Sequence, residues 1–402
     1  MYVTRPLSMY KKYPSALSLP PPEGPNSGIL VIQDEAAEPR HFFGLFKGHQ
    51  LKDLPFPQNK DLKLRYSYST GAGENSQQHV SRFYANFIPV LNQPLSSNRY
   101  YVIRSDGSHK GEACTNSTPE DIETCCFCNF VREVKPKPLY PQDIYQQFEI
   151  LRKRRFNQIG AGFVAKSVAP DGFPPKFLAR KGWEVYTSTP DNFHLEEASG
   201  LDTSLRSRLP EFDFPLVHTA HSSPVVVGKW YCPFMFIKEG SPKEQMSRSM
   251  YYQMTLEQRW EQIYSCEVDS SKEDDSAVSV DVSIQREVVM VSGNEVTNVE
   301  RDRVNGVVWF RSLNKVGGET CLGLSLEIVE RMEWEQKRGG WIRGLEGKVR
   351  VKKIEEYGVT KNGWSRFGCY VLVERFVLRR MDGSLVLVHD FRHTHHIRSK
   401  WE

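Results

Sequence analysis

The stretch that decides the fold is residues 369–393, CYVLVERFVLRRMDGSLVLVHDFRH. Apolar residues alternate with polar or charged ones on both sides of Asp382-Gly383, a dipeptide typical of the tight turn of a β-hairpin. A period of two places successive side chains on opposite faces of a strand. The stretch therefore predicts two long antiparallel strands, with one face packed and the other in water.

The same alternation occurs upstream, in SVDVSIQREVVM (279–290) and LGLSLEIVERMEW (322–334). Together these patterns predict strands over 278–291, 321–335 and 370–397. Residues 250–268, MYYQMTLEQRWEQIYSCEV, fit either a strand or a helix with a Thr255–Gln258 capping box. The alternation spans more residues than the helical pattern, so we expect a strand.

Residues before about 240 differ in character, because Pro and Gly interrupt short apolar runs. PQDIYQQFEILRKRRF predicts a helix near 141–155, and PPKFLARKG (174–182) a second short one. The expected fold class is α+β, mainly antiparallel β. A mixed, Pro/Gly-rich N-terminal domain (1–240) with one or two helices precedes a long-stranded antiparallel β domain (241–402).

Composition excludes several classes of protein. The 53 basic and 49 acidic residues give a net charge of +4, which is not the strongly basic balance typical of nucleic-acid-binding proteins. No apolar run reaches the 18 or so residues that a transmembrane helix needs, and no apolar leader is present at the N-terminus. We expect a cytoplasmic protein with eight reduced cysteines, with the nucleus or a plastid as alternatives.

Four histidines fall within residues 389–396. On a strand, His389, His393 and His395 would share one face, and two such imidazoles lack only a further ligand to hold zinc. A plain structural role at a strand end and a pH-responsive surface are the alternatives. No zinc is firmly predicted.

A second candidate metal or ligand site lies in CTNSTPEDIETCCFCNF (114–130). The spacing does not match the Cys-x2-Cys pairs of common zinc sites, so reduced cysteines under a loop, or redox-sensitive ones, are alternatives. The candidate ligands are Cys114, Cys125, Cys126, Cys128 and His109.

Recognised catalytic motifs are missing. The chain has no Gly-x-Ser-x-Gly, no phosphate-binding loop and no His-Glu-x-x-His. Catalytic residues therefore stay unassigned, and we regard enzymatic activity as uncertain and non-enzymatic function as the better interpretation.

Several segments resemble the plant protein family called domain of unknown function 1262. They span nearly the whole chain and are MYVTRPLSMYKKYPSALSLPPPEG (1–24), QDEAAEPR (33–40), LKDLPFPQNKDLKLRY (51–66), QPLSSNRYYVIRSDGSHKGEA (93–113), SVAPDGFPPKFLARKGWEVY (167–186) and TLEQRWEQIY (255–264). The resemblance implies a plant source and regulation in stress or defence responses. It implies no activity and supplies no site residues.

The leading hypothesis is a soluble, β-rich binding protein, whose partner is another protein or a small apolar ligand. One-sided sheets and the tryptophans Trp230, Trp341 and Trp364, expected to be exposed, motivate it. A metal-dependent enzyme that uses the C-terminal histidines is the alternative. A membrane-acting β-hairpin protein is a third hypothesis, which Arg286 and Glu330 weaken by interrupting the apolar rows.

Overall fold

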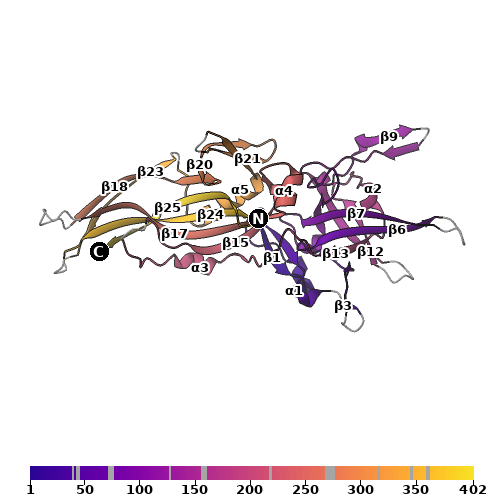
Figure 1. Ribbon diagram of the computed structural model, residues 1–402, viewed down its shortest axis with the longest axis horizontal. Coiled ribbons are helices and arrows are strands. Elements are labelled where there is room, and N and C mark those ends of the chain that lie inside the picture. The colour runs from indigo at the N-terminus through magenta and orange to yellow at the C-terminus, as the bar shows by residue number, and fades with distance from the viewer. Residues whose placement is uncertain are drawn as a thin grey trace.

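The computed structural model shows an elongated molecule in which two sheets extend toward opposite ends and the N-terminus lies between them (Figure 1). Most of the pairing is antiparallel, which confirms a mainly antiparallel β fold. Among the described residues, no helix has both the length and the apolar character needed to cross a membrane. The structure describes residues 1–38, 40–41, 46–70, 77–125, 128–154, 161–216, 220–267, 277–314, 317–344, 347–358 and 363–402.

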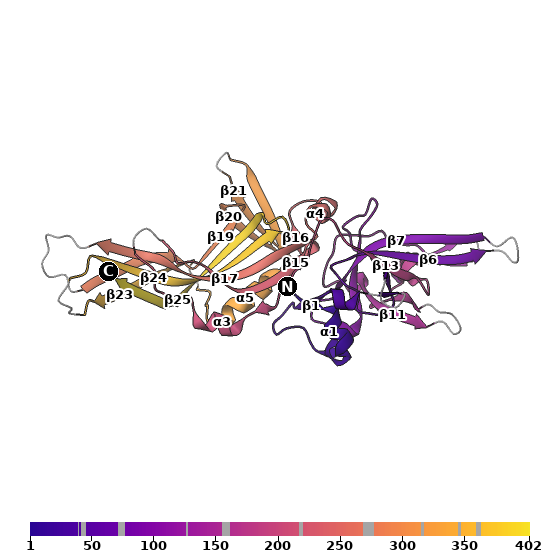
Figure 2. The same cartoon turned by 60° about the horizontal axis from the view of Figure 1, so that its bottom comes forward.

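The larger sheet has twelve strands and is built around three long ones, β17 (Tyr251–Glu267), β24 (Arg366–Arg380) and β25 (Leu385–Trp401). The Asp382-Gly383 turn joins β24 to β25, so the predicted hairpin is present. Figure 2 shows β19, β20 and β21 rising away from the long strands. From one edge, the remaining strands are β16 (Ile237–Lys238), β22 (Glu319–Ser325), β21 (Val307–Leu313), β20 (Asn294–Asp302) and β19 (Glu287–Val291), then, beyond the long three, β15 (Val225–Pro233), β1 (Tyr2–Pro6) and β2 (Gly28–Ile32), with β14 (Gly200–Leu201) on β15.

The smaller sheet has seven strands and its own core, in which Phe56, Phe87 and Trp183 are completely buried. In order its strands are β12 (Ala161–Ser167), β11 (Gln147–Arg154), β8 (Arg99–Arg104), β7 (Gln77–Pro89), β6 (Asp61–Thr70), β13 (Glu184–Ser188) and β5 (Gln50–Leu51). Three two-stranded sheets pair β18 (Ala277–Gln285) with β23 (Lys348–Glu356), β9 (Ile122–Cys125) with β10 (Cys128–Val131), and β3 (Arg40–His41) with β4 (Phe46–Lys47).

Helices are short apart from α5 (Leu326–Arg338). The other α-helices are α1 (Leu7–Lys12), α2 (Lys176–Ala179), α3 (Thr203–Arg208) and α4 (Pro242–Arg248). The 3-10 turns are η1 (Pro14–Ser18), η2 (Glu35–Ala37), η4 (Leu95–Ser97), η5 (Pro119–Asp121), η6 (Ile144–Gln146) and η7 (Phe234–Phe236).

The helix predicted over 141–155 is wrong. Only the turn η6 is helical there, and β11 follows it at once, paired with β8 and β12. Phe148 and Ile150 point into the core of the smaller sheet at a spacing of two. Ile144 is largely exposed, so the helical spacing of Ile144, Phe148 and Leu151 does not mark a buried face.

The strand predicted over 321–335 is also wrong in its second half. β22 ends at Ser325, and α5 begins at the next residue. Glu330 therefore lies on a helix and does not interrupt a strand, so that argument against the membrane-acting hypothesis is lost. In contrast, residues 251–267 form the strand β17, as predicted.

Both faces of the central strands are covered, contrary to the expectation of one wet face. In β24, Tyr370 and Leu372 pack under a segment that contains Phe212, whereas Phe367 and Cys369 pack against β18. The expected domain boundary at residue 240 also falls within one sheet, because β15 and β17 are paired on either side of it.

Candidate functional site: an apolar pocket between the two sheets

The floor of the pocket is formed where β16, β22 and β21 lie side by side. In the strand register Lys238 and Trp309 both oppose Gly323, one from each side. A Cβ atom on Gly323 would approach the Trp309 ring to 2.8 Å and the Lys238 Cβ to 2.9 Å. The missing side chain therefore lets the indole and the lysine stem lie against the sheet.

The roof of the pocket is the loop 138–141, which belongs to the smaller-sheet region. The buried Gln146 holds this loop, because its Oε1 accepts a hydrogen bond from the Tyr140 N–H (2.7 Å) and its Nε2 donates to the Pro138 carbonyl (3.1 Å). The Tyr101 hydroxyl donates to the Pro141 carbonyl at 3.0 Å. These bonds fix the roof in place without a ligand.

The side wall comes from η7 and the start of α4. Gly111 has a φ of +88° and packs so closely on Pro242 that a Cβ atom would overlap the Pro242 carbonyl. Gln245 is buried on α4 and donates from its Nε2 to the Ile237 carbonyl at 3.0 Å, which ties the helix to β16. Segments far apart in sequence thus meet around one cavity.

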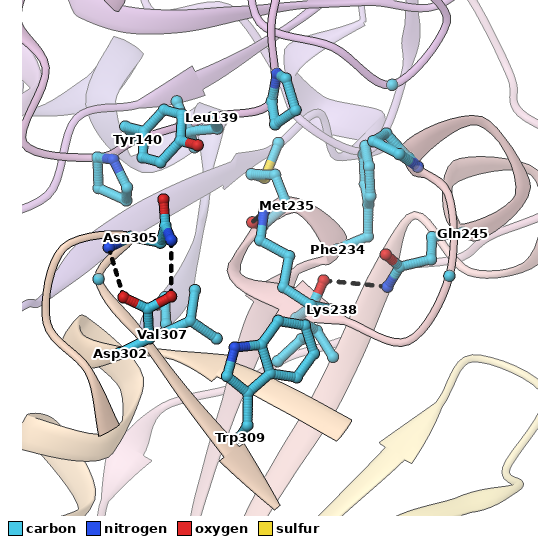
Figure 3. Close-up of a pocket in the computed structure, with 18 residues that line it drawn as sticks. Leu139, Tyr140, Phe234, Met235, Lys238, Gln245, Asp302, Asn305, Val307 and Trp309 are labelled. Atoms are coloured by element: carbon cyan, nitrogen blue, oxygen red, sulfur yellow. Dashed lines mark hydrogen bonds between the residues drawn. The ribbon is translucent and has the colours of Figure 1, made fainter. Parts of the chain in front are cut away.

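The cavity has a volume of about 320 Å³ and mainly apolar walls (Figure 3). Sites for small molecules in proteins have this character: a concave, mostly apolar lining with a few placed polar groups, often at the junction of two structural units. Its lining residues are Gly111, Pro138, Leu139, Tyr140, Pro141, Phe234, Met235, Ile237, Lys238, Gly240, Pro242, Gln245, Asp302, Asn305, Gly306, Val307, Trp309 and Ser325.

Three polar groups stand out in this lining. The Lys238 amine donates to the Met235 carbonyl at 3.0 Å, and burial lowers its pKa, although the charge of Glu327 acts in the opposite direction. The Ser325 Oγ is buried and has no hydrogen-bond partner among the described residues. Asp302 accepts hydrogen bonds from the side chain and backbone of Asn305, which lower its pKa.

The described lining contains no histidine or cysteine, and its nucleophilic or titratable side chains are Tyr140, Lys238, Asp302 and Ser325. The arrangement is suited to binding. Sequence reasoning missed all of these residues, because Lys238, Trp309 and Ser325 come from separate segments that carry no motif.

The predicted histidine site is divided between two environments in the fold. His389 stacks on Phe391 with ring centres 4.1 Å apart, and its Nε2 lies 3.7 Å from a Glu287 oxygen. His393 is buried, with its Nε2 3.0 Å from the Gln336 Oε1 and 3.6 Å from a Glu374 oxygen.

His395 lies at the surface, in the same strand as the other two. Its ring centre is 5.3 Å from that of His393 and 4.3 Å from that of His396. Burial, with the charges of His396 and His393, lowers the pKa of His395.

The described residues contain no cluster of three ligands with metal-binding geometry. A zinc site at these histidines stays a prediction, which metal analysis of the purified protein tests.

The predicted cysteine site is not assembled by the described residues. Burial raises the pKa of Cys114 to about 12, so this thiol is protonated at neutral pH. His109 lies beside Glu112, with its Nδ1 2.5 Å from a carboxylate oxygen. Cys125 and Cys128 are opposite each other in the β9–β10 pair, and Cys126 lies outside the described residues.

The predicted surface exposure is wrong for two of the three tryptophans. Trp230 and Trp341 are 1% and 4% exposed, so both belong to the core. Trp364 is partly buried and packs edge-on against Trp401.

Comparison with known protein families finds a match over part of the chain. The model of a family described as "Protein of unknown function (DUF1262)" matches residues 23–127, which supports the resemblance there. No curated protein matches the chain. The crystal structure of Cry35Ab1 is similar with a TM-score of 0.43 and 12% sequence identity, covering 86% of this chain and 90% of that one. A likeness at this level carries no argument about function.

Proposed function

We propose that this protein binds a small, mainly apolar molecule in the pocket between the two sheets. The observation that carries the proposal is a preformed cavity of about 320 Å³, with apolar walls from the larger sheet and from loops of the smaller-sheet region. Gln146 accepts a hydrogen bond from the Tyr140 N–H in the roof, and Gln245 donates one to the Ile237 carbonyl in the side wall. A cavity that is rigid before binding loses little conformational entropy when a ligand enters.

The family resemblance supplies the setting of this proposal. We infer a plant protein that acts in stress or defence responses, as a cytoplasmic member of its family. In that setting the ligand would be a metabolite, and binding would change how the two sheet regions are held together, because the roof is a loop of one region and the floor is the sheet of the other.

The test is a screen of the purified full chain against small aromatic and aliphatic compounds, both neutral and charged. Thermal shift would select candidates, and ligand-detected NMR would confirm them. We expect at least one compound to bind saturably. Trp309→Ala should weaken its binding by about tenfold or more, because an indole supplies a large apolar contact.

The matched control is Ile342→Ala, which removes an apolar side chain that is 74% exposed and does not line the pocket. This variant should bind like the wild type. Absence of any saturable compound, or equal loss of binding in both variants, would contradict the proposal.

A further inference from the structure

Lys238 is a partly buried cation that forms no ion pair with the described carboxylates, although the charge of Glu327 acts on it. Its only hydrogen-bond partner among the described residues is the Met235 carbonyl, at 3.0 Å. An ammonium group has three donors, so two directions stay open. Figure 3 shows the side chain crossing the middle of the pocket, above Trp309. Burying an unpaired charge is costly, and an anion brought by a ligand would offset that cost.

A second observation in the same cavity points to the same kind of ligand group. Ser325 is the N-cap residue of α5, a helix of 13 residues, yet its side chain makes no capping bond. Its Oγ is buried without a partner among the described residues. The N-terminus of a helix carries partial positive charge from its free N–H groups, which favours an anion beside it.

Two carboxylates, those of Asp302 and Glu327, are candidates for an ion pair with Lys238. Asp302 also lines the pocket, but Figure 3 shows it turned toward Asn305, whose backbone and side chain donate to it. Glu327, in the first turn of α5, accepts a hydrogen bond from Gln142 at 2.9 Å. The charge of Glu327 raises the pKa of Lys238, but neither carboxylate accepts a hydrogen bond from its amine in the described part of the chain, where that amine donates to the Met235 carbonyl.

We propose that the ligand of this pocket carries a carboxylate, which accepts hydrogen bonds from the Lys238 amine and the Ser325 hydroxyl while its apolar body packs on Trp309. This inference rests on the proposed function and adds the chemical class of the ligand: a small amphipathic acid. A neutral ligand of the same shape would leave the ammonium without an ion-pair partner.

The experiment compares 2-naphthoate with 2-naphthamide, which have the same ring system and differ in charge. Calorimetric titration of the full chain near neutral pH should show the acid binding about tenfold or more tightly, as expected for a hydrogen bond to a charged group. Lys238→Met keeps an unbranched apolar stem but removes the charge, and it should abolish this preference. Lys238→Arg should keep much of it.

Ser325→Ala should reduce the preference for the acid by a smaller factor. Lys352→Met is the control, because Lys352 is an exposed lysine on β23 and does not line the pocket. It should leave both affinities unchanged. In the wild type, the preference should also fall as pH rises and Lys238 loses its proton, which provides a measurement that needs no variant.

The outcomes separate this inference from the proposed function. If the amide binds as tightly as the acid and Lys238→Met changes neither, the carboxylate inference is overturned while ligand binding stands. If neither probe binds and the wider screen finds no ligand, both are overturned. Should Lys238→Met fail to fold, the wild-type ratio of affinities and its pH dependence decide.

Discussion

Arg206 is buried at a point where four elements meet. From α3 its Nε donates to a Glu374 oxygen on β24 at 2.7 Å, and its Nη2 donates to the second oxygen at 2.5 Å. The same Nη2 donates to the Glu335 carbonyl at the end of α5, at 2.9 Å. Gln258 on β17 donates to Glu374 as well, at 2.9 Å. A two-point guanidinium–carboxylate pair of this kind fixes geometry as well as charge.

The charge of Glu374 should make the stability of the protein depend on pH. Burial alone would raise the pKa of this carboxyl, but His393 and Arg206 lower it from 4.5 to about 2. A lowered pKa gives stability that is present above pH 4.5 and is lost as pH falls toward 2. From the shift, protonation of this group alone would lower the free energy of unfolding by about 2 kcal/mol between pH 7 and pH 3.

Glu374→Gln should therefore lower the free energy of unfolding at pH 7 by about 3 kcal/mol, because Arg206 is left buried without its partner. The variant should also lose less stability than the wild type between pH 7 and pH 3. Urea unfolding at the two pH values measures both effects. Glu196→Gln, which breaks an exposed pair with Lys229, should change stability by less than about 1 kcal/mol. A Glu374→Gln profile parallel to that of the wild type would show that the pair contributes nothing.

His393 shows how far residue-level prediction could go. The alternating pattern placed it correctly on a strand, next to apolar neighbours. Its partners Gln336 and Glu374 lie 57 and 19 positions away in the chain, on α5 and β24, and no local pattern indicates either. The sequence therefore left a metal ligand, a pH-responsive residue and a structural residue as alternatives, and it could not indicate these hydrogen-bond and charge partners.

At the scale of elements, the wrong prediction for α5 has a physical reason. Its buried residues Ile328, Val329 and Met332 fit helical spacing. Every second residue from position 322 to 334 is apolar as well, with the charged Glu330 as the one exception. A short window cannot separate the two periods. The abundance of Glu, Gln, Arg and Lys over 327–338, all good helix formers, was the signal that favoured a helix.

β11 illustrates the opposite error, in which context overrides a helical pattern. Its pairing with β8 and β12 and the burial of Phe148 are long-range facts that a single segment does not contain. β17, which has 17 residues, was predicted correctly because the alternating pattern covers more of its residues than the helical pattern does. Long elements with one period were predictable, whereas short or mixed ones depended on their neighbours.

The end of α5 depends on a glycine that makes room for Arg206. A Cβ atom on Gly339 would overlap the Arg206 Nη2, which is held by Glu374 and cannot move freely. Gly339→Ala should lower the free energy of unfolding by about 1–3 kcal/mol through overpacking. Gly363→Ala is the control, because a Cβ atom there meets nothing within 4 Å. Equal melting temperatures for the two variants would show that Arg206 adjusts without cost.

At the scale of the whole molecule, the N-terminal strands complete a sheet that the rest of the chain starts. β1 pairs with β15, and β15 pairs with the long β17. The two sheet regions are also tied together, since the Tyr251 hydroxyl donates to the Gln58 carbonyl at 3.0 Å and the Tyr2 hydroxyl to the Pro89 carbonyl at 2.8 Å. The frequency of Pro and Gly changes near residue 240, but this change could not show that strands on both sides of it pair.

This arrangement predicts which fragments of the chain fold. The core of the smaller sheet is formed by residues between Leu51 and Val185, so a fragment of residues 48–190 contains all of it and should unfold cooperatively in urea. A fragment of residues 241–402 lacks β15 and β1, which leaves one edge of β17 unpaired and exposes apolar side chains such as Met254 and Leu256. It should aggregate, or should show no cooperative transition by circular dichroism. A soluble 241–402 fragment with a sharp transition would instead support a boundary at residue 240, and it would mean that the pairing of β15 with β17 is dispensable.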